Sequence, residues 1–220
     1  MSSGADPSRC VVLTPAARYI EPHCDLSLRQ LESAGYTVRR WFGGSLVDVL
    51  RNRLATQALA DGFEELMWID SDIAFDPSSV DRLRAHALPL VCGMYPTKIE
   101  CLPTWVEAPG ASAAVAAGAS LLEIHYAGCG FFLARAEVFR EVQRRENLPV
   151  CNSQAGDPMV PYFLPMVIER HGAATYLEAD YAFCERARRA GFQIFADPAV
   201  ILQHIGLCGY FVKKAPLTAG

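Results

Sequence analysis

The segment Met67-Trp68-Ile69-Asp70-Ser71-Asp72-Ile73-Ala74-Phe75-Asp76-Pro77 decides how this sequence folds. Its beginning belongs to a largely apolar run, which predicts a buried strand over residues 65–70. Asp76 followed by Pro77 predicts the start of a helix, because a carboxylate caps the helix and proline suits its first turn. We expect residues 71–75 to form a loop at the carboxyl end of the strand.

The sequence before this segment alternates short apolar runs with helical patterns. Residues 10–14 predict a buried strand that Pro15 stops, and residues 36–41 predict a second strand. A helix is expected between them, from about residue 22 to 34. A further helix is expected to begin at Ser45 and to end near residue 61, with a buried stripe formed by Leu46, Leu50, Leu54 and Ala58.

The sequence after the segment is less regular. Residues 108–118 are rich in alanine, glycine and serine and predict a mobile connection instead of a packed helix. Residues 147–165 contain four prolines and predict a long loop, a feature that often forms a lid or a binding loop. Regular elements are predicted elsewhere, with strands over 88–95, 121–125, 130–134 and 199–203 and helices over 136–147 and 181–190.

Together these patterns predict an α/β fold with a mostly parallel mixed sheet, flanked by helices on both faces. The chain has 220 residues, of which 51% are hydrophobic, so we expect a single domain over residues 1–220 with a large core. Eight cysteines occur singly along the chain and never as a C-x-x-C pair, which predicts reduced thiols within the core.

Charge and hydropathy exclude several classes of partner. The formal net charge is −4, and lysine and arginine are scattered, so the sequence lacks the basic patch that a nucleic-acid partner requires. Apolar runs are much shorter than the ~20 residues of a transmembrane helix. The first residues show no basic segment followed by an apolar one, so we expect no secretory signal and a cytoplasmic protein.

Asp70 and Asp72 are the first candidates for chemistry. Residues at i and i+2 of an extended segment project to the same side, so both carboxylates can converge on one cation beyond the strand. Carboxylate oxygens together with phosphates and water suit Mg²⁺ or Mn²⁺. In open α/β sheets, ligands bind outside the carboxyl ends of the strands, where this triplet lies. The alternative is that Asp-Ser-Asp is an ordinary turn after a strand.

Further segments extend this pattern in a fixed order. The triplet is followed by Val91-Cys92-Gly93-Met94-Tyr95-Pro96-Thr97-Lys98, then by Gly128-Cys129-Gly130-Phe131-Phe132-Leu133-Ala134-Arg135. Residues 180–191 begin with Asp180 and continue as a helix, and His204 and Gly206 close the series. Over most of residues 11–206 this order resembles small GT-A type glycosyltransferases, whose donors are nucleotide sugars. One departure is that Ala179 precedes Asp180, where that family usually has glutamate; Glu178 is displaced by one position.

The resemblance implies a GT-A (Rossmann-like) fold and a role for each matching residue. It implies that Asp180 is the general base and that Mn²⁺ or Mg²⁺ is the cofactor. The implied metal ligands are Asp70, Asp72 and His204, and the implied nucleotide-sugar contacts are Thr14, Pro15, Arg51, Asn52, Asp70, Ser71, Asp72 and Lys98.

The residues themselves leave simpler interpretations open. On a helical wheel Arg51 flanks the buried stripe whereas Asn52 points away from it, which favours Arg51 alone as a site residue. Asp180 could have a purely structural role, as the cap of the helix that follows it. His204 could be a hydrogen-bonded structural residue, and Lys98 could be a solvated lysine of a turn.

The favoured interpretation is an inverting, metal-dependent glycosyltransferase. Its donor would be a nucleoside-diphosphate sugar, with a UDP-sugar favoured, and its acceptor a hydroxyl of a glycan, a lipid-linked molecule or a protein. A sugar-phosphate nucleotidyltransferase is an alternative, although residues 13–18 are not the Gly-rich phosphate loop expected of one. A non-catalytic nucleotide-sugar binding protein is a second alternative, suggested by the displaced Glu178.

Overall fold

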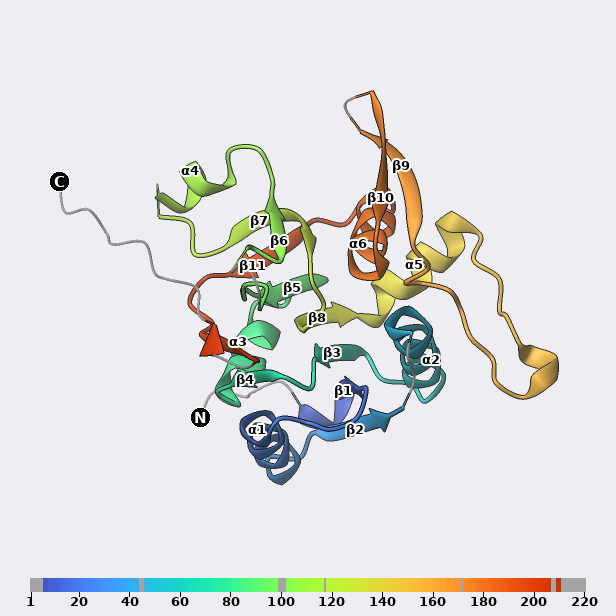
Figure 1. Ribbon diagram of the computed structural model, residues 1–220, viewed down its shortest axis with the longest axis horizontal. Coiled ribbons are helices and arrows are strands. Elements are labelled where there is room, and N and C mark those ends of the chain that lie inside the picture. Colours follow the sequence, from blue (N-terminus) through green and yellow to red (C-terminus); the bar gives the residue numbers. More distant parts are fainter. Residues whose placement is uncertain are drawn as a thin grey trace.

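A computed structural model describes residues 6–43, 46–98, 102–116, 118–170, 172–206 and 209–210. A central sheet forms the middle layer and helices lie on both of its sides (Figure 1). The strands of this sheet are β1 (Cys10–Ala16), β2 (Thr37–Phe42), β3 (Glu65–Ile69), β5 (Leu90–Gly93), β6 (Trp105–Glu107), β7 (Leu122–Ala127), β8 (Phe131–Arg135) and β11 (Ile194–Asp197).

The sheet has the strand order β2-β1-β3-β8-β5-β11-β7-β6. β1 pairs in parallel with β2 and β3, and β5 pairs in parallel with β11. β8 lies antiparallel between β3 and β5, and β7 lies antiparallel between β11 and β6. Six strands therefore run in one direction and two in the other, which confirms the predicted mostly parallel mixed sheet.

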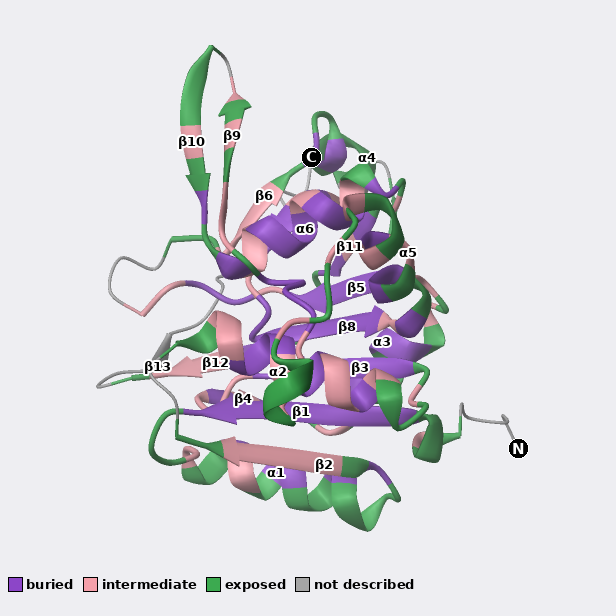
Figure 2. Cartoon of the chain, turned by 90° about the vertical axis from the view of Figure 1, so that its right-hand side faces the viewer, coloured by how far each residue is buried: buried purple, intermediate pink, exposed green. Residues whose placement is uncertain are grey.

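The strands in the middle of the sheet bury both of their faces, since successive side chains point to opposite sides of the sheet and both sides are covered. In β1, Val11 and Leu13 belong to one hydrophobic core while Cys10 and Val12 belong to the other. Helices α1 (Pro22–Ser33) and α3 (Ser78–Ala85) cover the second core. The first core is covered by α2 (Val47–Ala60), α4 (Ala111–Ala116), α5 (Ala136–Glu146) and α6 (Ala179–Arg189). The strands β1, β3, β5 and β8 in the middle of the sheet are buried almost throughout, whereas β2 and β6 at its two edges are only partly buried (Figure 2).

Two smaller sheets and two short helical turns complete the described chain. Strand β4 (Ile73–Phe75) pairs with β12 (Leu202–Ile205), which pairs with β13 (Gly209–Tyr210). Strands β9 (Met166–Arg170) and β10 (Ala173–Leu177) form a hairpin that extends away from the body of the molecule (Figures 1 and 2). The 3₁₀ turns are η1 (Pro7–Arg9) and η2 (Ser153–Ala155).

Three predicted element boundaries are wrong. Pro15 does not stop β1: beyond Leu13 only β2 pairs with β1, so proline lies at a local edge where its missing N–H costs little. Residues 71–75 are not wholly a loop, because β4 forms there by pairing with β12. The last predicted strand is displaced, and His204 lies within β12 instead of after it.

Two helix predictions also need correction. Leu46 is exposed because it precedes α2 in an extended conformation, where a helical wheel does not apply; Ser45 lies outside the described residues. Residues 108–118 contain the short helix α4, which the high helix propensity of alanine explains. The helix predicted over residues 136–147 is confirmed as α5, which buries Val138, Phe139 and Val142.

The predicted reduced thiols are confirmed for the cysteines that the structure describes with their side chains. Cys101 and Cys208 lie outside this part. The others are free, and all but Cys151 are buried: Cys10, Cys24, Cys92, Cys129, Cys151 and Cys184.

Candidate active site

A cleft with a volume of about 1100 Å³ opens where β3, β5 and β8 bring their loops together. Asp70 follows β3 directly and lies in the wall of this cleft, as do Lys98, Asp180 and His204. Several predicted site residues from distant parts of the sequence therefore share one cavity. The cleft is also lined by Val47, Asp48, Tyr95, Leu102, Tyr176 and Glu178.

Asp70 is held from two sides. Its backbone N–H donates to the carbonyl of Gly130 at 2.9 Å, and Nη2 of Arg51 donates to Oδ1 at 2.9 Å. Burial raises the pKa of Asp70, and the nearby carboxylates of Asp180 and Asp72 raise it further, while Arg51 opposes the shift. The Asp70 carboxylate is thus partly desolvated and would gain from a positive partner in the cleft.

Arg51 lies between the two carboxylates of the site. Only 2% of its side chain is exposed, its Nε is 3.0 Å from Oδ1 of Asp180, and its guanidinium lies 5.4 Å from the ring centre of Trp68. It does not line the cleft but fixes Asp70 and Asp180 relative to each other. The implied contact of Arg51 with the nucleotide stays a prediction.

Asp72 is surrounded by cationic and hydrogen-bonding groups. It forms an ion pair with Lys98, and its Oδ1 is 3.5 Å from Nε2 of His204. Although burial alone would raise the pKa of Asp72, hydrogen bonds from His204 and Lys98 lower it below the ordinary value. The pairing of β4 with β12 creates this arrangement, since it places His204 opposite Ile73 and lets the N–H of Ile205 donate to the Asp72 carbonyl.

Asp180 is anchored to the backbone of a neighbouring segment. Its Oδ2 accepts the N–H of Cys129 at 2.8 Å, and its Oδ1 is buried beside Arg51. The simpler interpretation, in which Asp180 caps α6, is wrong. Asp180 lies inside the helix, whose N-cap position is Glu178. Because Oδ1 is buried and the group lines the cleft, Oδ2 is the oxygen left to receive a proton from a bound molecule.

Other predicted contacts lie outside the cleft lining. Thr14 and Pro15 are buried within β1. Asn52 is buried, and its Oδ1 accepts the N–H of Phe163 at 2.7 Å, so it holds the 160–163 loop onto α2. Ser71 joins the triplet to the start of α1, since its carbonyl accepts the N–H of Glu21 at 2.8 Å. Their implied contacts with the nucleotide sugar stay predictions.

Sequence reasoning missed Tyr95. Its hydroxyl accepts the N–H of Gly130 at 2.8 Å, and its ring meets the ring of His204 edge-on with centroids 5.3 Å apart. Burial raises the pKa of Tyr95 well above the ordinary value, so it stays a neutral hydroxyl. The only sequence signal was its position three residues before Lys98 in the segment quoted above.

The described residues can be tested for a fit to a divalent cation. Within the ranges given above, no group of three or more His, Cys, Asp or Glu side chains stands ready to hold a metal. Asp72 and His204 form a preassembled pair, and Nδ1 of His204 is 2.8 Å from the Pro96 carbonyl. A carbonyl only accepts, so Nδ1 carries a proton, and Nε2, which faces Asp72, would bind a metal in its unprotonated form. The residues fit a cation whose remaining ligands come from a bound diphosphate and water.

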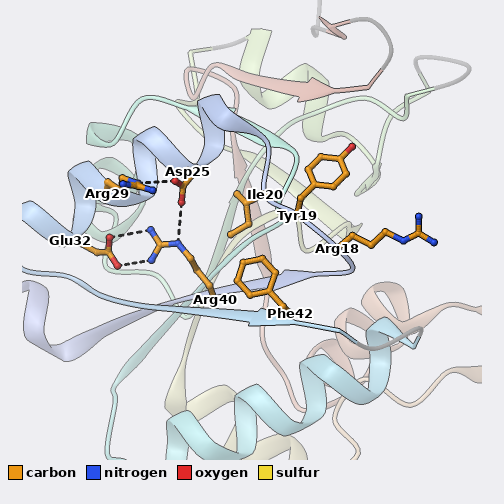
Figure 3. A pocket seen from close by; sticks show the side chains of 8 residues that line it. All are labelled: Arg18, Tyr19, Ile20, Asp25, Arg29, Glu32, Arg40 and Phe42. Carbon is orange, nitrogen blue, oxygen red and sulfur yellow. Dashed lines mark hydrogen bonds and ion pairs between the residues drawn. The ribbon is translucent and has the colours of Figure 1, made fainter.

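A second cavity, of about 590 Å³, lies between α1, β2 and the loop before α1 (Figure 3). Its charged groups mainly neutralise one another. Arg40 pairs with Asp25 and Glu32, and Arg29 pairs with Asp25. This cavity therefore lacks the converging, incompletely satisfied polar groups of the main cleft.

Replacing Gly130 by Ala is expected to disturb the site more than the fold. A Cβ at this position would lie 2.5 Å from Oη of Tyr95 and 3.0 Å from Oδ2 of Asp70, so both groups must move. We expect the variant to lose ligand binding in the cleft while its melting temperature changes by only about 2–8 °C, as for a clash of about 1–2 kcal/mol. The Cys129→Ala variant is the control, because it keeps the backbone N–H that binds Asp180. Equal ligand affinity of Gly130→Ala and the unaltered chain would contradict the described packing.

No protein-family model matches the sequence, and a comparison with curated proteins finds no match. Solved structures that match this chain include A197 from STIV, at 12% sequence identity and a TM-score of 0.58, covering 97% of this chain and 98% of that chain. They also include UDP-glucose pyrophosphorylase complexed with UDP-glucose, at 10% identity and a TM-score of 0.47, covering 88% and 92%. A glycosyltransferase involved in the glycosylation of the major capsid of PBCV-1 has 14% identity and a TM-score of 0.33, covering 63% and 66%.

These likenesses bear on the fold alone. The first extends over nearly the whole of both chains and agrees with the predicted α/β architecture. Among the described residues, no helix combines the length and apolar character needed to cross a membrane. The chain is thus an α/β protein with a mixed central sheet, and its function has to be argued from the cleft.

Proposed function

We propose that this chain transfers a sugar from a nucleoside-diphosphate donor to a hydroxyl acceptor, with Mn²⁺ or Mg²⁺ as cofactor. One observation carries the proposal: Asp180, anchored by Arg51 and the Cys129 N–H, lines the same cleft as Asp70 and His204, and His204 lies 3.5 Å from Asp72. Such a cleft offers a proton acceptor beside a place for a cation. A UDP-sugar is the favoured donor, and the protein is expected to act in the cytoplasm.

Asp180 is the residue proposed to take the proton of the acceptor hydroxyl. A general base acts best when its position is fixed, and both carboxylate oxygens of Asp180 have such a fixed neighbour. Glu178 also lines the cleft, but it is exposed and the described chain gives it no partner. A base on the far side of the sugar from the leaving diphosphate would invert the anomeric configuration, which nuclear magnetic resonance of the product can check.

Asp72 and His204 are proposed to hold the cation, with Asp70 beside them. When bound, Mn²⁺ or Mg²⁺ would neutralise charge that develops on the leaving diphosphate. Lys98, which pairs with Asp72, is placed to contact the same phosphates. The remaining residues proposed to contact the donor, or to position the residues that do, are Thr14, Pro15, Arg51, Asn52 and Ser71.

Donor binding is the first test. With a donor present at about 100 times its Kd, the melting temperature should rise by about 5–10 °C, provided that Mn²⁺ is present. The Asp72→Asn variant should lose the metal-dependent part of this rise, because it removes one of two preassembled ligands. The Asp48→Asn variant, which alters another acid of the same cleft, is the matched control. If the donor-induced rise in melting temperature depended neither on metal nor on Asp72→Asn, the proposed cation site would be wrong.

Product analysis separates the alternatives. A glycosyltransferase releases nucleoside diphosphate from the donor, at a slow rate with water and faster with a hydroxyl acceptor. A sugar-phosphate nucleotidyltransferase would consume the donor only when pyrophosphate is added. Binding without turnover of any uridine or guanosine diphosphate sugar would favour a non-catalytic binding protein.

A further inference from the structure

Apolar side chains surround the mouth of the cleft. Val47 at the start of α2, Leu102 in the loop before β6 and Tyr176 in β10 all line it, with exposed fractions of 50%, 51% and 64%. These residues come from three distant parts of the sequence and meet at one opening. Exposed apolar side chains gathered in this way mark a binding surface and are not required by the core.

The β9–β10 hairpin extends this apolar surface beyond the cleft lining. Val167 stands directly opposite Tyr176 in the hairpin register and is 64% exposed as well. The alternate residues Met166 and Ile168 pack against the main core. Since the core uses one face of the hairpin, the Val167–Tyr176 pair on the other face stays free for a bound molecule.

Charges in the cleft restrict what this molecule can carry. The nitrogen groups of the cleft, Lys98 and His204, both contact Asp72. Asp48 and Glu178 also line the cleft and add negative charge. An anionic group near the opening would be repelled by these carboxylates, and the apolar side chains around the opening would desolvate a charge of either sign. The surface therefore favours an uncharged molecule.

We infer that the acceptor is an uncharged amphiphile, which rests on the function proposed above. Its polar head places the reacting hydroxyl at Asp180, and its apolar group lies on Val47, Leu102 and Tyr176. The cleft volume of about 1100 Å³ gives room for both substrates, since a pocket for one small ligand measures about 300–1,000 Å³. In the transfer, the acceptor oxygen bonds to the anomeric carbon, the diphosphate leaves with the electron pair of the broken bond, and the proton goes to Asp180.

The test compares octyl and methyl glycosides of the same neutral sugars, glucose and galactose, as ligands of the full chain. Calorimetry below the micelle concentration should show at least about tenfold tighter binding of the octyl compound, because burial of two methylene groups already gives that ratio. The same preference should appear in kcat/KM when a donor sugar is supplied. The Val167→Ser/Tyr176→Ser double variant should lower the ratio of the two affinities, because it removes the hairpin's part of the apolar surface while Val47 and Leu102 remain. Both altered residues are exposed, so the fold should persist, and the melting temperature verifies this.

The Val150→Ser variant is the matched control, since Val150 is 51% exposed but does not line the cleft. It should keep the octyl preference in full. Equal affinity for octyl and methyl glycosides, or a preference that the double variant leaves unchanged, overturns the inference. Calorimetry measures glycoside binding and needs no turnover. If the melting experiment shows no donor binding, the proposed function is wrong, but the calorimetric test of the apolar surface still gives its own answer.

Discussion

The Asp180→Asn variant is expected to transfer sugar about 100–10,000-fold more slowly than the unaltered chain, which is the usual contribution of a general base. Asparagine keeps the shape of the side chain and can still accept the N–H of Cys129, so the cleft should stay assembled. The donor-induced rise in melting temperature should therefore persist while kcat falls. Steady-state kinetics and thermal melting on the same preparation measure both quantities.

The Glu178→Gln variant is the control for this experiment. It removes the neighbouring carboxylate, which lines the same cleft but has no partner in the described parts of the chain. We expect it to keep most of the rate. If Glu178→Gln lost most of the transfer rate while Asp180→Asn lost little, the general base would be Glu178. That residue lies two positions before the one that the family resemblance assigns.

The Arg51→Met variant is expected to lose about 3–5 kcal/mol of unfolding free energy, because removal of one partner from a buried ion pair leaves the other charges uncompensated. Here two carboxylates, Asp70 and Asp180, would lose their shared cation. Methionine fills a similar volume against Trp68, so the loss should reflect charge more than a cavity. Urea denaturation followed by circular dichroism, with a chelator present, measures it.

Arg53 offers a matched control two residues along the same helix. It forms an ion pair with Asp157 at 2.6 Å, but the two side chains are 35% and 39% exposed. The Arg53→Met variant should therefore cost only about 0–1 kcal/mol. If Arg51→Met and Arg53→Met destabilise the chain equally, Arg51 does not act as the buried bridge described above.

Most of the central sheet could be predicted because its strands are buried on both faces. Continuous apolar runs such as residues 66–69 are typical of such strands, and the helices between them show regular apolar spacing. The β9–β10 hairpin could not be found in this way. Its strands alternate between partly buried and exposed residues, and they follow a proline-rich stretch that hides the pattern.

The candidate site was predictable in its members but not in its contacts. The i, i+2 spacing of Asp70 and Asp72 follows from the strand before them. Their separate partners do not: Arg51 reaches Asp70 from α2, while Lys98 and His204 reach Asp72. Asn52 shows the limit of a helical wheel, since it points away from the apolar stripe yet is buried under the 160–163 loop. A wheel describes one helix and cannot include segments that pack on it later.

The pairing of β4 with β12 has a consequence for the order in which the chain matures. Residues 73–75 and 202–204 can meet only after residue 204 has left the ribosome. The first three strands, β1 to β3, need only residues up to 69 and can pair much earlier. Contacts between residues so far apart form slowly, because a long loop has to close first. During synthesis, a nascent chain would therefore hold Asp72 for some time without His204, and its capacity to bind a cation would arise among the last steps of folding.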